Sequence, residues 1–255
     1  MERERIVDAV RAAVEPAPWV LALWEGGSAS FGRVDALSDM DLGIAAEDGR
    51  IGETFDLVEA ALEDLAGIDA RWTENPVDHP KPQRYYRLRG TAPLVDVGVL
   101  PVSTPPLERF VDRRRHGKPR VAFDRAGFTA DVPQDPAEWR DRLRRRVADI
   151  RARFEMLGGL PMKSSQRGES AEAVVFYQAL VLRPLVEMLR IRHDPWRYDF
   201  GVRYLRFDIP EPARSRIQRL WFVRNQIDLR EKHAEASEWL RQELATLDVD
   251  RVPLD

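Results

Sequence analysis

Hydrophobic positions recur in two different ways along the chain, and the change falls near its middle. In the first half, short apolar runs alternate with polar turns, which predicts strands mixed with a few helices. The expected strands cover residues 19–25, 40–45, 68–73, 83–89, 93–101 and 119–123, and the expected helices cover 2–14, 51–66 and about 106–115. In the second half, apolar residues recur every three or four positions, which is typical of helices that share a core. These expected helices cover about residues 136–157, 169–192, 212–225 and 228–247.

The segment between the two halves, from Asp124 to Pro136, is rich in proline, glycine and aspartate. Such a composition favours an exposed boundary between domains. We therefore predict an α+β protein of two domains. Residues 1–130 would form a short mixed β-sheet flanked by helices, and residues 131–255 would form a helical bundle.

Composition narrows the classes of protein that remain. The 255 residues include no cysteine, which excludes disulfides and thiolate metal sites and favours a reducing compartment. The first residues precede an amphipathic helix, and no apolar run approaches the roughly 20 residues that span a bilayer, so we expect a cytoplasmic protein without a membrane partner. A net charge of −3 gives no general attraction to nucleic acid, which is not an expected partner. The sequence leaves the oligomeric state open.

A turn of two glycines and a serine, Gly26-Gly27-Ser28, directly follows the first apolar run. The backbone N–H groups of such a turn can bind a phosphate. Asp39 and Asp41 then stand at alternate positions where the next strand is expected. Residues two apart on a strand point to the same face, so both carboxylates can converge on one divalent cation. This layout predicts metal-assisted transfer of a phosphoryl or nucleotidyl group.

A third aspartate, Asp96, lies at the centre of the apolar strand expected over residues 93–101. An ionised carboxylate in such a strand is unfavourable by several kcal/mol unless a metal, a cation or hydrogen bonds compensate it. Asp96 could complete an Mg²⁺ site, because Mg²⁺ prefers oxygen ligands, or it could act as the general base for an attacking hydroxyl. A buried pair with an arginine is the structural alternative.

Together, Gly27-Ser28, Asp39, Asp41 and the later Asp96 resemble the DNA polymerase β-type nucleotidyltransferase superfamily. With the helical second half, the chain is similar to two-domain aminoglycoside nucleotidyltransferases and their relatives. The resemblance implies that Gly27 and Ser28 contact the triphosphate of ATP or another NTP. It also implies that the three aspartates hold Mg²⁺ while an acceptor hydroxyl attacks the α-phosphorus and pyrophosphate leaves.

In the second half, residues 196–204 resemble the segment from which such enzymes supply a basic residue to the triphosphate. Arg197 and Arg203 are therefore expected to bind the nucleotide, because a cation there would neutralise charge on the leaving pyrophosphate. The alternative is that both arginines pair with Asp199 or Asp208.

The resulting hypothesis is an Mg²⁺-dependent nucleotidyltransferase that transfers a nucleoside monophosphate, with AMP from ATP as the expected donor group, to a hydroxyl of a small molecule. Two alternatives stay open. One is a protein-modifying or antitoxin-type nucleotidyltransferase, and the other is a catalytically silent nucleotide-binding regulatory module. The sequence fixes neither the acceptor nor the base of the nucleotide.

Overall fold

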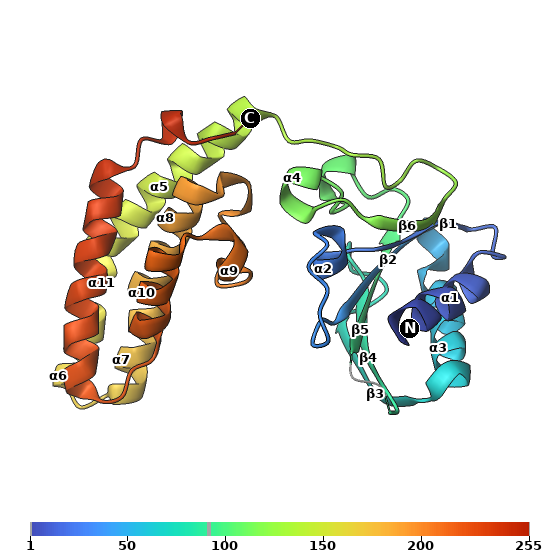
Figure 1. Cartoon of the computed structure of the whole chain (residues 1–255), viewed down its shortest axis with the longest axis horizontal. Helices are drawn as coiled ribbons and strands as arrows, with labels where there is room; N and C mark the ends of the chain where they lie inside the picture. The colour runs from blue at the N-terminus through green and yellow to red at the C-terminus, as the bar shows by residue number, and fades with distance from the viewer. Residues whose placement is uncertain (1, 91–92, 255) are drawn as a thin grey trace. The chain divides into compact units, whose positions relative to one another are not determined.

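The computed structural model describes residues 2–90 and 93–254, and the chain divides into two compact units, residues 1–134 and 135–255 (Figure 1). The first unit contains a six-stranded sheet in the order β3-β4-β5-β2-β1-β6. Its strands are β1 (Val20–Glu25), β2 (Met40–Ala46), β3 (Ile68–Asn75), β4 (Gln83–Leu88), β5 (Leu94–Pro101) and β6 (Arg120–Asp124). Only the neighbours β2 and β5 run parallel among these described strands, so the sheet is mixed, as predicted.

Two helices, α1 (Glu2–Val14) and α3 (Ile51–Ala66), lie together on one side of this sheet (Figure 1). They share an apolar core with alternate residues of the central strands: Met40, Leu42, Ile44, Val95, Val97 and Val99. Because strand side chains alternate between faces, the residues between these core positions point to the opposite face. Asp41 and Asp96 therefore lie on the face that α1 and α3 leave uncovered.

The loops of the first unit differ from the expected pattern at two places. The glycine turn after β1 closes into a single helical turn, α2 (Gly27–Ser30). The helix expected near residues 106–115 is instead split into the 3₁₀ turn η2 (Pro106–Glu108) and the short helix α4 (Arg113–His116). Between them Phe110 adopts a φ of 57°, a left-handed conformation that interrupts any continuous helix. A further 3₁₀ turn, η1 (Asp48–Arg50), precedes α3.

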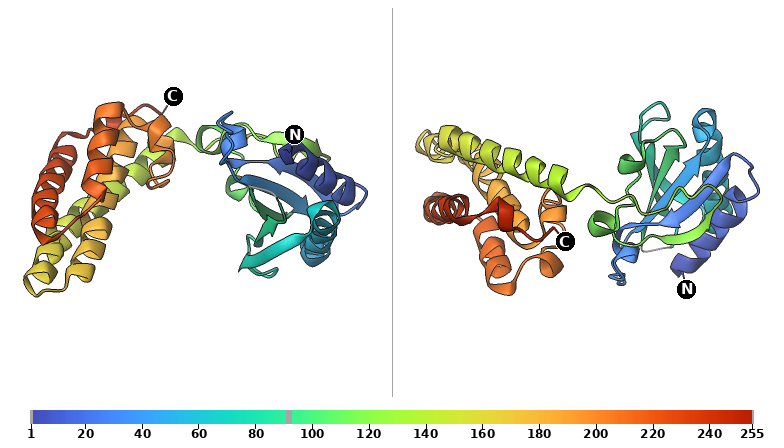
Figure 2. Two further views of the ribbon diagram at one scale, coloured as in Figure 1. Left: turned by 60° about the horizontal axis from the view of Figure 1, so that its bottom comes forward. Right: turned by 90° about the horizontal axis from the view of Figure 1, so that it is seen from above.

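In residues 135–254 the structure describes helices and no strand, which confirms the predicted helical second half (Figure 2). The α-helices are α5 (Pro136–Leu157), α6 (Leu160–Gln166), α7 (Ser170–Tyr177), α8 (Arg183–His193), α9 (Leu205–Asp208), α10 (Glu211–Trp221) and α11 (Gln226–Thr246), with 3₁₀ turns η4 (Pro195–Arg197) and η5 (Val249–Arg251). Their buried apolar residues form one core, which includes Trp139, Tyr177 and Leu240.

The long helix expected over residues 169–192 contains a π turn, η3 (Gln178–Leu182), between α7 and α8. Pro184 follows directly and has no N–H to donate to the carbonyl four residues earlier, so a widened turn accommodates it. The short helices α6 and α9 were not expected from the sequence. None of the helices in the described ranges combines the length and the apolar character that crossing a membrane requires.

Candidate functional site

The glycine turn and strand β2 are tied together by their backbones. The N–H of Gly26 donates to the carbonyl of Asp41 at 2.7 Å. Gly27 has a φ of 53°, and a Cβ atom built on it would lie 1.7 Å from Oδ2 of Asp41. Glycine is therefore required here for two reasons, since a side chain would strain the backbone and would also displace the carboxylate. The turn and this carboxylate are in close contact only because residue 27 has no side chain.

Ser28 is 9% exposed, and its hydroxyl has no hydrogen-bond partner among the residues that the structure describes. A buried polar group without a partner is unfavourable by about 1–3 kcal/mol, and such groups are rare in native proteins. The hydroxyl stands one residue after Gly27, at the turn expected to bind phosphate. A ligand oxygen would satisfy it, which is the observation that favours a bound group at this turn.

Asp41 and Asp96 are paired in register on the parallel strands β2 and β5. Paired residues on adjacent strands point to the same face, and their backbones lie about 4.8 Å apart. The two carboxylates are thus neighbours on the uncovered face of the sheet, and both are half-buried. Neighbouring negative charges repel each other, and a divalent cation between them would remove that repulsion.

Asp96 accepts hydrogen bonds from the side-chain amide of Gln83 on β4. Nε2 of Gln83 lies 2.7 Å from Oδ1 and 2.8 Å from Oδ2 of Asp96. The same nitrogen lies 2.9 Å from the hydroxyl of Tyr85. Gln83 therefore orients the carboxylate and stabilises its charged form. The sequence did not single out Gln83, because the pairing of β4 with β5 is not visible in the local pattern.

Asp39 lies just before β2 and is exposed. Its Oδ1 accepts a hydrogen bond from the N–H of Leu94 at 3.1 Å, which joins the starts of β2 and β5. Across residues 2–90 and 93–254 no three histidine, aspartate or glutamate side chains gather as ready metal ligands. The structure therefore places Asp41 beside Asp96 and engages Asp39 with the backbone of β5.

The residues present nevertheless fit Mg²⁺ bound together with a nucleotide. Mg²⁺ is commonly held by one or two carboxylates plus substrate phosphates, rather than by a complete protein cage. Asp41 and Asp96 supply the two carboxylates. The absence of a side chain at Gly27 lets the Asp41 carboxylate lie against the turn, and the hydroxyl of Ser28 lacks a partner within the described chain.

Two aromatic residues occupy the positions on β4 and β3 that continue the cross-strand pairing of Asp41 with Asp96. Trp72 on β3 is paired with Tyr85 on β4, and Tyr85 is paired with Asp96 on β5. The rings of Trp72 and Tyr85 are stacked, with centroids 5.4 Å apart and planes inclined by 20°. Trp72 is 61% exposed. The row thus runs from Trp72 through Tyr85 and Asp96 to Asp41, so a stacked aromatic pair flanks the carboxylates on the β4 side.

Arg197, in the second unit, belongs to a buried network of charges. Its Nη2 lies 2.6 Å from Asp194 and 3.2 Å from Asp208, and its side chain is 12% exposed. Asp208 also pairs with Arg190 at 3.0 Å, and neither of these two side chains is exposed. Pairing with Asp208 was the alternative expected from the sequence. Arg203 is exposed, and its backbone carbonyl accepts a hydrogen bond from Arg190. Nucleotide binding by Arg197 and Arg203 stays a prediction.

No family model and no curated protein matches the sequence. Comparison with solved structures finds an aminoglycoside 6-adenyltransferase from Bacillus subtilis, with 11% identity, a TM-score of 0.32 and coverage of 96% of this chain and 92% of that one. A nucleotidyltransferase-like protein from Exiguobacterium sibiricum has 11% identity, a TM-score of 0.43 and coverage of 95% and 74%. A CdnC–HORMA complex from E. coli has 14% identity, a TM-score of 0.28 and coverage of 92% and 89%.

The first two of these structures are described as an aminoglycoside adenyltransferase and a nucleotidyltransferase-like protein. All three TM-scores are below 0.5, so these likenesses assign no function to the chain.

Proposed function

We propose that this protein is a metal-dependent nucleotidyltransferase that transfers a nucleoside monophosphate from an NTP to a hydroxyl group and releases pyrophosphate. The observation that carries this proposal is the in-register pair Asp41 and Asp96 beside the Gly27-Ser28 turn. Two neighbouring carboxylates suit a divalent cation, and a glycine turn with an unpartnered hydroxyl suits a phosphate.

In this proposal Asp41 and Asp96 hold Mg²⁺, which neutralises phosphate charge when bound. The backbone of Gly27 and the hydroxyl of Ser28 bind the phosphates. A bond forms between the acceptor oxygen and the α-phosphorus, and the bond from that phosphorus to the pyrophosphate oxygen breaks. In the same proposal Asp96, the carboxylate next to β4, accepts the proton of the acceptor hydroxyl. Asp39 would be a third ligand of Mg²⁺ if its hydrogen bond with the N–H of Leu94 were broken.

The side from which the acceptor approaches is suggested by the aromatic pair. Tyr85 separates Trp72 from Asp96 in the row across the sheet, so it borders the space next to that carboxylate. An acceptor with a flat or apolar ring face could stack there while its hydroxyl reaches Asp96. We therefore propose a small ring-bearing hydroxyl compound as acceptor. The proposed donor is ATP, as the resemblance of the sequence implies. The side chain of Arg203 is exposed, whereas that of Arg197 is engaged with Asp194 and Asp208, so we propose Arg203 rather than Arg197 as the phosphate-binding arginine.

The test is release of pyrophosphate from each of the four NTPs, with Mg²⁺ or with EDTA. Acceptors would include aminoglycosides, neutral sugars, nucleosides and other ring alcohols. We expect release that requires Mg²⁺, prefers ATP, and disappears in Asp41→Asn. Binding of NTP without release under any acceptor would indicate a catalytically silent nucleotide-binding module. No binding and no release would refute the proposal.

A further inference from the structure

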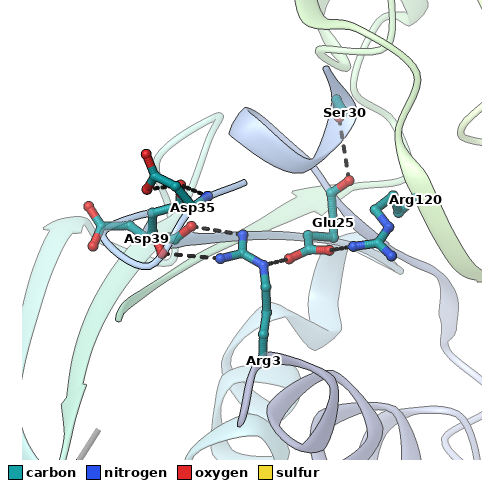
Figure 3. Close-up of polar contacts among 7 residues, drawn as sticks. Arg3, Glu25, Ser30, Asp35, Asp39 and Arg120 are labelled. Atoms are coloured by element: carbon teal, nitrogen blue, oxygen red, sulfur yellow. Dashed lines mark hydrogen bonds and ion pairs between the residues drawn. The ribbon is translucent and has the colours of Figure 1, made fainter. Parts of the chain in front are cut away.

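One arginine, Arg3, forms hydrogen bonds with residues at both ends of the loop that carries Gly27 and Ser28. This loop, residues 26–39, begins after Glu25 at the end of β1 and leads into β2. Nε of Arg3, on α1, donates to Oε1 of Glu25. Nη1 and Nη2 of the same guanidinium donate to the carbonyls of Ser38 at 3.1 Å and Asp39 at 2.8 Å. Figure 3 shows Arg3 between these two ends of the loop.

The contact with Glu25 is strong because it is buried. The side chains of Arg3 and Glu25 are 15% and 5% exposed. A buried carboxylate needs such partners, and hydrogen bonds between charged groups are stronger than those between neutral ones. Arg120 of β6 also approaches Glu25, at 3.4 Å, but its own side chain is 60% exposed. Arg3 is therefore the principal partner of this carboxylate among the described residues.

The same guanidinium also sets where β2 begins. Its two carbonyl acceptors belong to the residues immediately before Met40, and Asp41 follows on the same strand. Backbone bonds also hold the loop, with the N–H of Gly26 donating to Asp41 at 2.7 Å and the N–H of Lys118 donating to Ser30 at 2.9 Å. Arg3 thus bonds both ends of the loop from α1, in addition to the backbone bond between Gly26 and Asp41.

We propose that Arg3 is a positioning residue for nucleotide binding, because it fixes the loop of Gly27 and Ser28 relative to Asp41 without touching the ligand. This inference rests on the proposed function. Arg3 lies on the side of the sheet that α1 covers, whereas Asp41 points to the opposite side. Its influence therefore passes through the backbone of residues 26–39.

The test compares Arg3→Met with Arg11→Met, a control on the same helix whose ion pair with Glu15 is more open to solvent, at 46% and 35% exposure. Binding of the Mg²⁺ complex of α,β-methylene-ATP is measured by calorimetry, and hydrogen exchange of residues 26–39 is followed without ligand. We expect roughly tenfold weaker binding for Arg3→Met, as for other residues that orient a ligand site, with faster exchange confined to this loop. The control should behave as the wild type.

Arg3→Lys separates positioning from stability. A lysine keeps the charge beside Glu25, but one ammonium cannot reproduce the fork that reaches all three acceptors. We expect a melting temperature near that of the wild type together with weakened binding of the analogue. If Arg3→Met and Arg3→Lys both bind as the wild type does, Arg3 has no positioning role. If the wild type itself does not bind the analogue, the proposed function fails and this inference fails with it.

Discussion

Asp41 on β2 and Asp96 on β5 are direct neighbours in register on parallel strands, although they are far apart in the sequence. Their side chains share the face of the sheet opposite α1 and α3, where the glycine turn reaches Oδ2 of Asp41. Nothing local to either aspartate brings them together, since the pairing depends on the crossover through α3 and the β3–β4 hairpin. The proposed chemistry follows from this one relationship.

Asp41→Asn and Asp96→Asn should each remove activity without unfolding the protein. Asparagine keeps the shape of the side chain but removes a charge that would hold the metal, so turnover should fall by about 10³-fold or more. Loss of one of two repelling carboxylates should leave the melting temperature unchanged or slightly raised. Pyrophosphate release and thermal unfolding would be measured together, with the exposed Asp56→Asn on α3 as control. A variant with near-wild-type turnover would exclude its residue from the site.

Ser28→Ala and Gly27→Ala should have opposite effects on stability. The substitution Ser28→Ala removes only a buried hydroxyl that has no partner in the described chain. The free energy of unfolding should therefore stay the same or rise, while nucleotide binding weakens. Gly27→Ala forces a side chain into a left-handed conformation and against the carboxylate of Asp41. We expect Gly27→Ala to lower the free energy of unfolding by about 1–3 kcal/mol. Urea unfolding and nucleotide titration would measure the two effects, and equal binding by Ser28→Ala would exclude its hydroxyl from phosphate binding.

Arg197→Met and Arg203→Met should separate a structural arginine from a nucleotide-binding one. Arg197 neutralises Asp194 and Asp208 in the core of the second unit, so its removal should destabilise the protein by about 1–3 kcal/mol without any nucleotide. Arg203→Met should leave stability unchanged, because its side chain is exposed. Arg153→Met, on an exposed position of α5, is the control. Unchanged stability in Arg197→Met would show that the network does not depend on it.

Stability should fall as the pH is lowered through the range in which histidine titrates. Burial lowers the pKa of His233 below its usual value, although a hydrogen bond with the carbonyl of Gly158 partly opposes this. The unfolded chain therefore binds a proton more readily than the folded one, and the stabilising contribution is complete only above the unfolded pKa of about 6.5. We expect the melting temperature to decrease between about pH 7.5 and 5.5. In His233→Gln the decrease should be smaller, with the remainder due partly to His193, whose pKa is lowered by partial desolvation and by the neighbouring Arg192.

The sequence by itself determined the kinds of element and the local chemistry. Short apolar runs between turns predicted β2 and β5, helical spacing predicted α3 and α5, and the turn at Gly26-Gly27-Ser28 was visible directly. These features depend on local periodicity and on residue conformational preference, which a single sequence displays. The interruption at the π turn before Pro184 was missed, although the proline itself was a signal for it.

Only the tertiary structure decided which residues meet. It paired Asp41 with Asp96, turned the side chain of Asp39 to the backbone of Leu94, and placed Gln83 against Asp96. It also brought the guanidinium of Arg3 to the carbonyls of Ser38 and Asp39, at the end of the loop formed by residues 26–39. Strand order and register arise from how whole faces are buried together, and a shift by one residue would move every side chain to the other face. For that reason the residue types of the site could be read from the sequence, whereas its geometry required the fold.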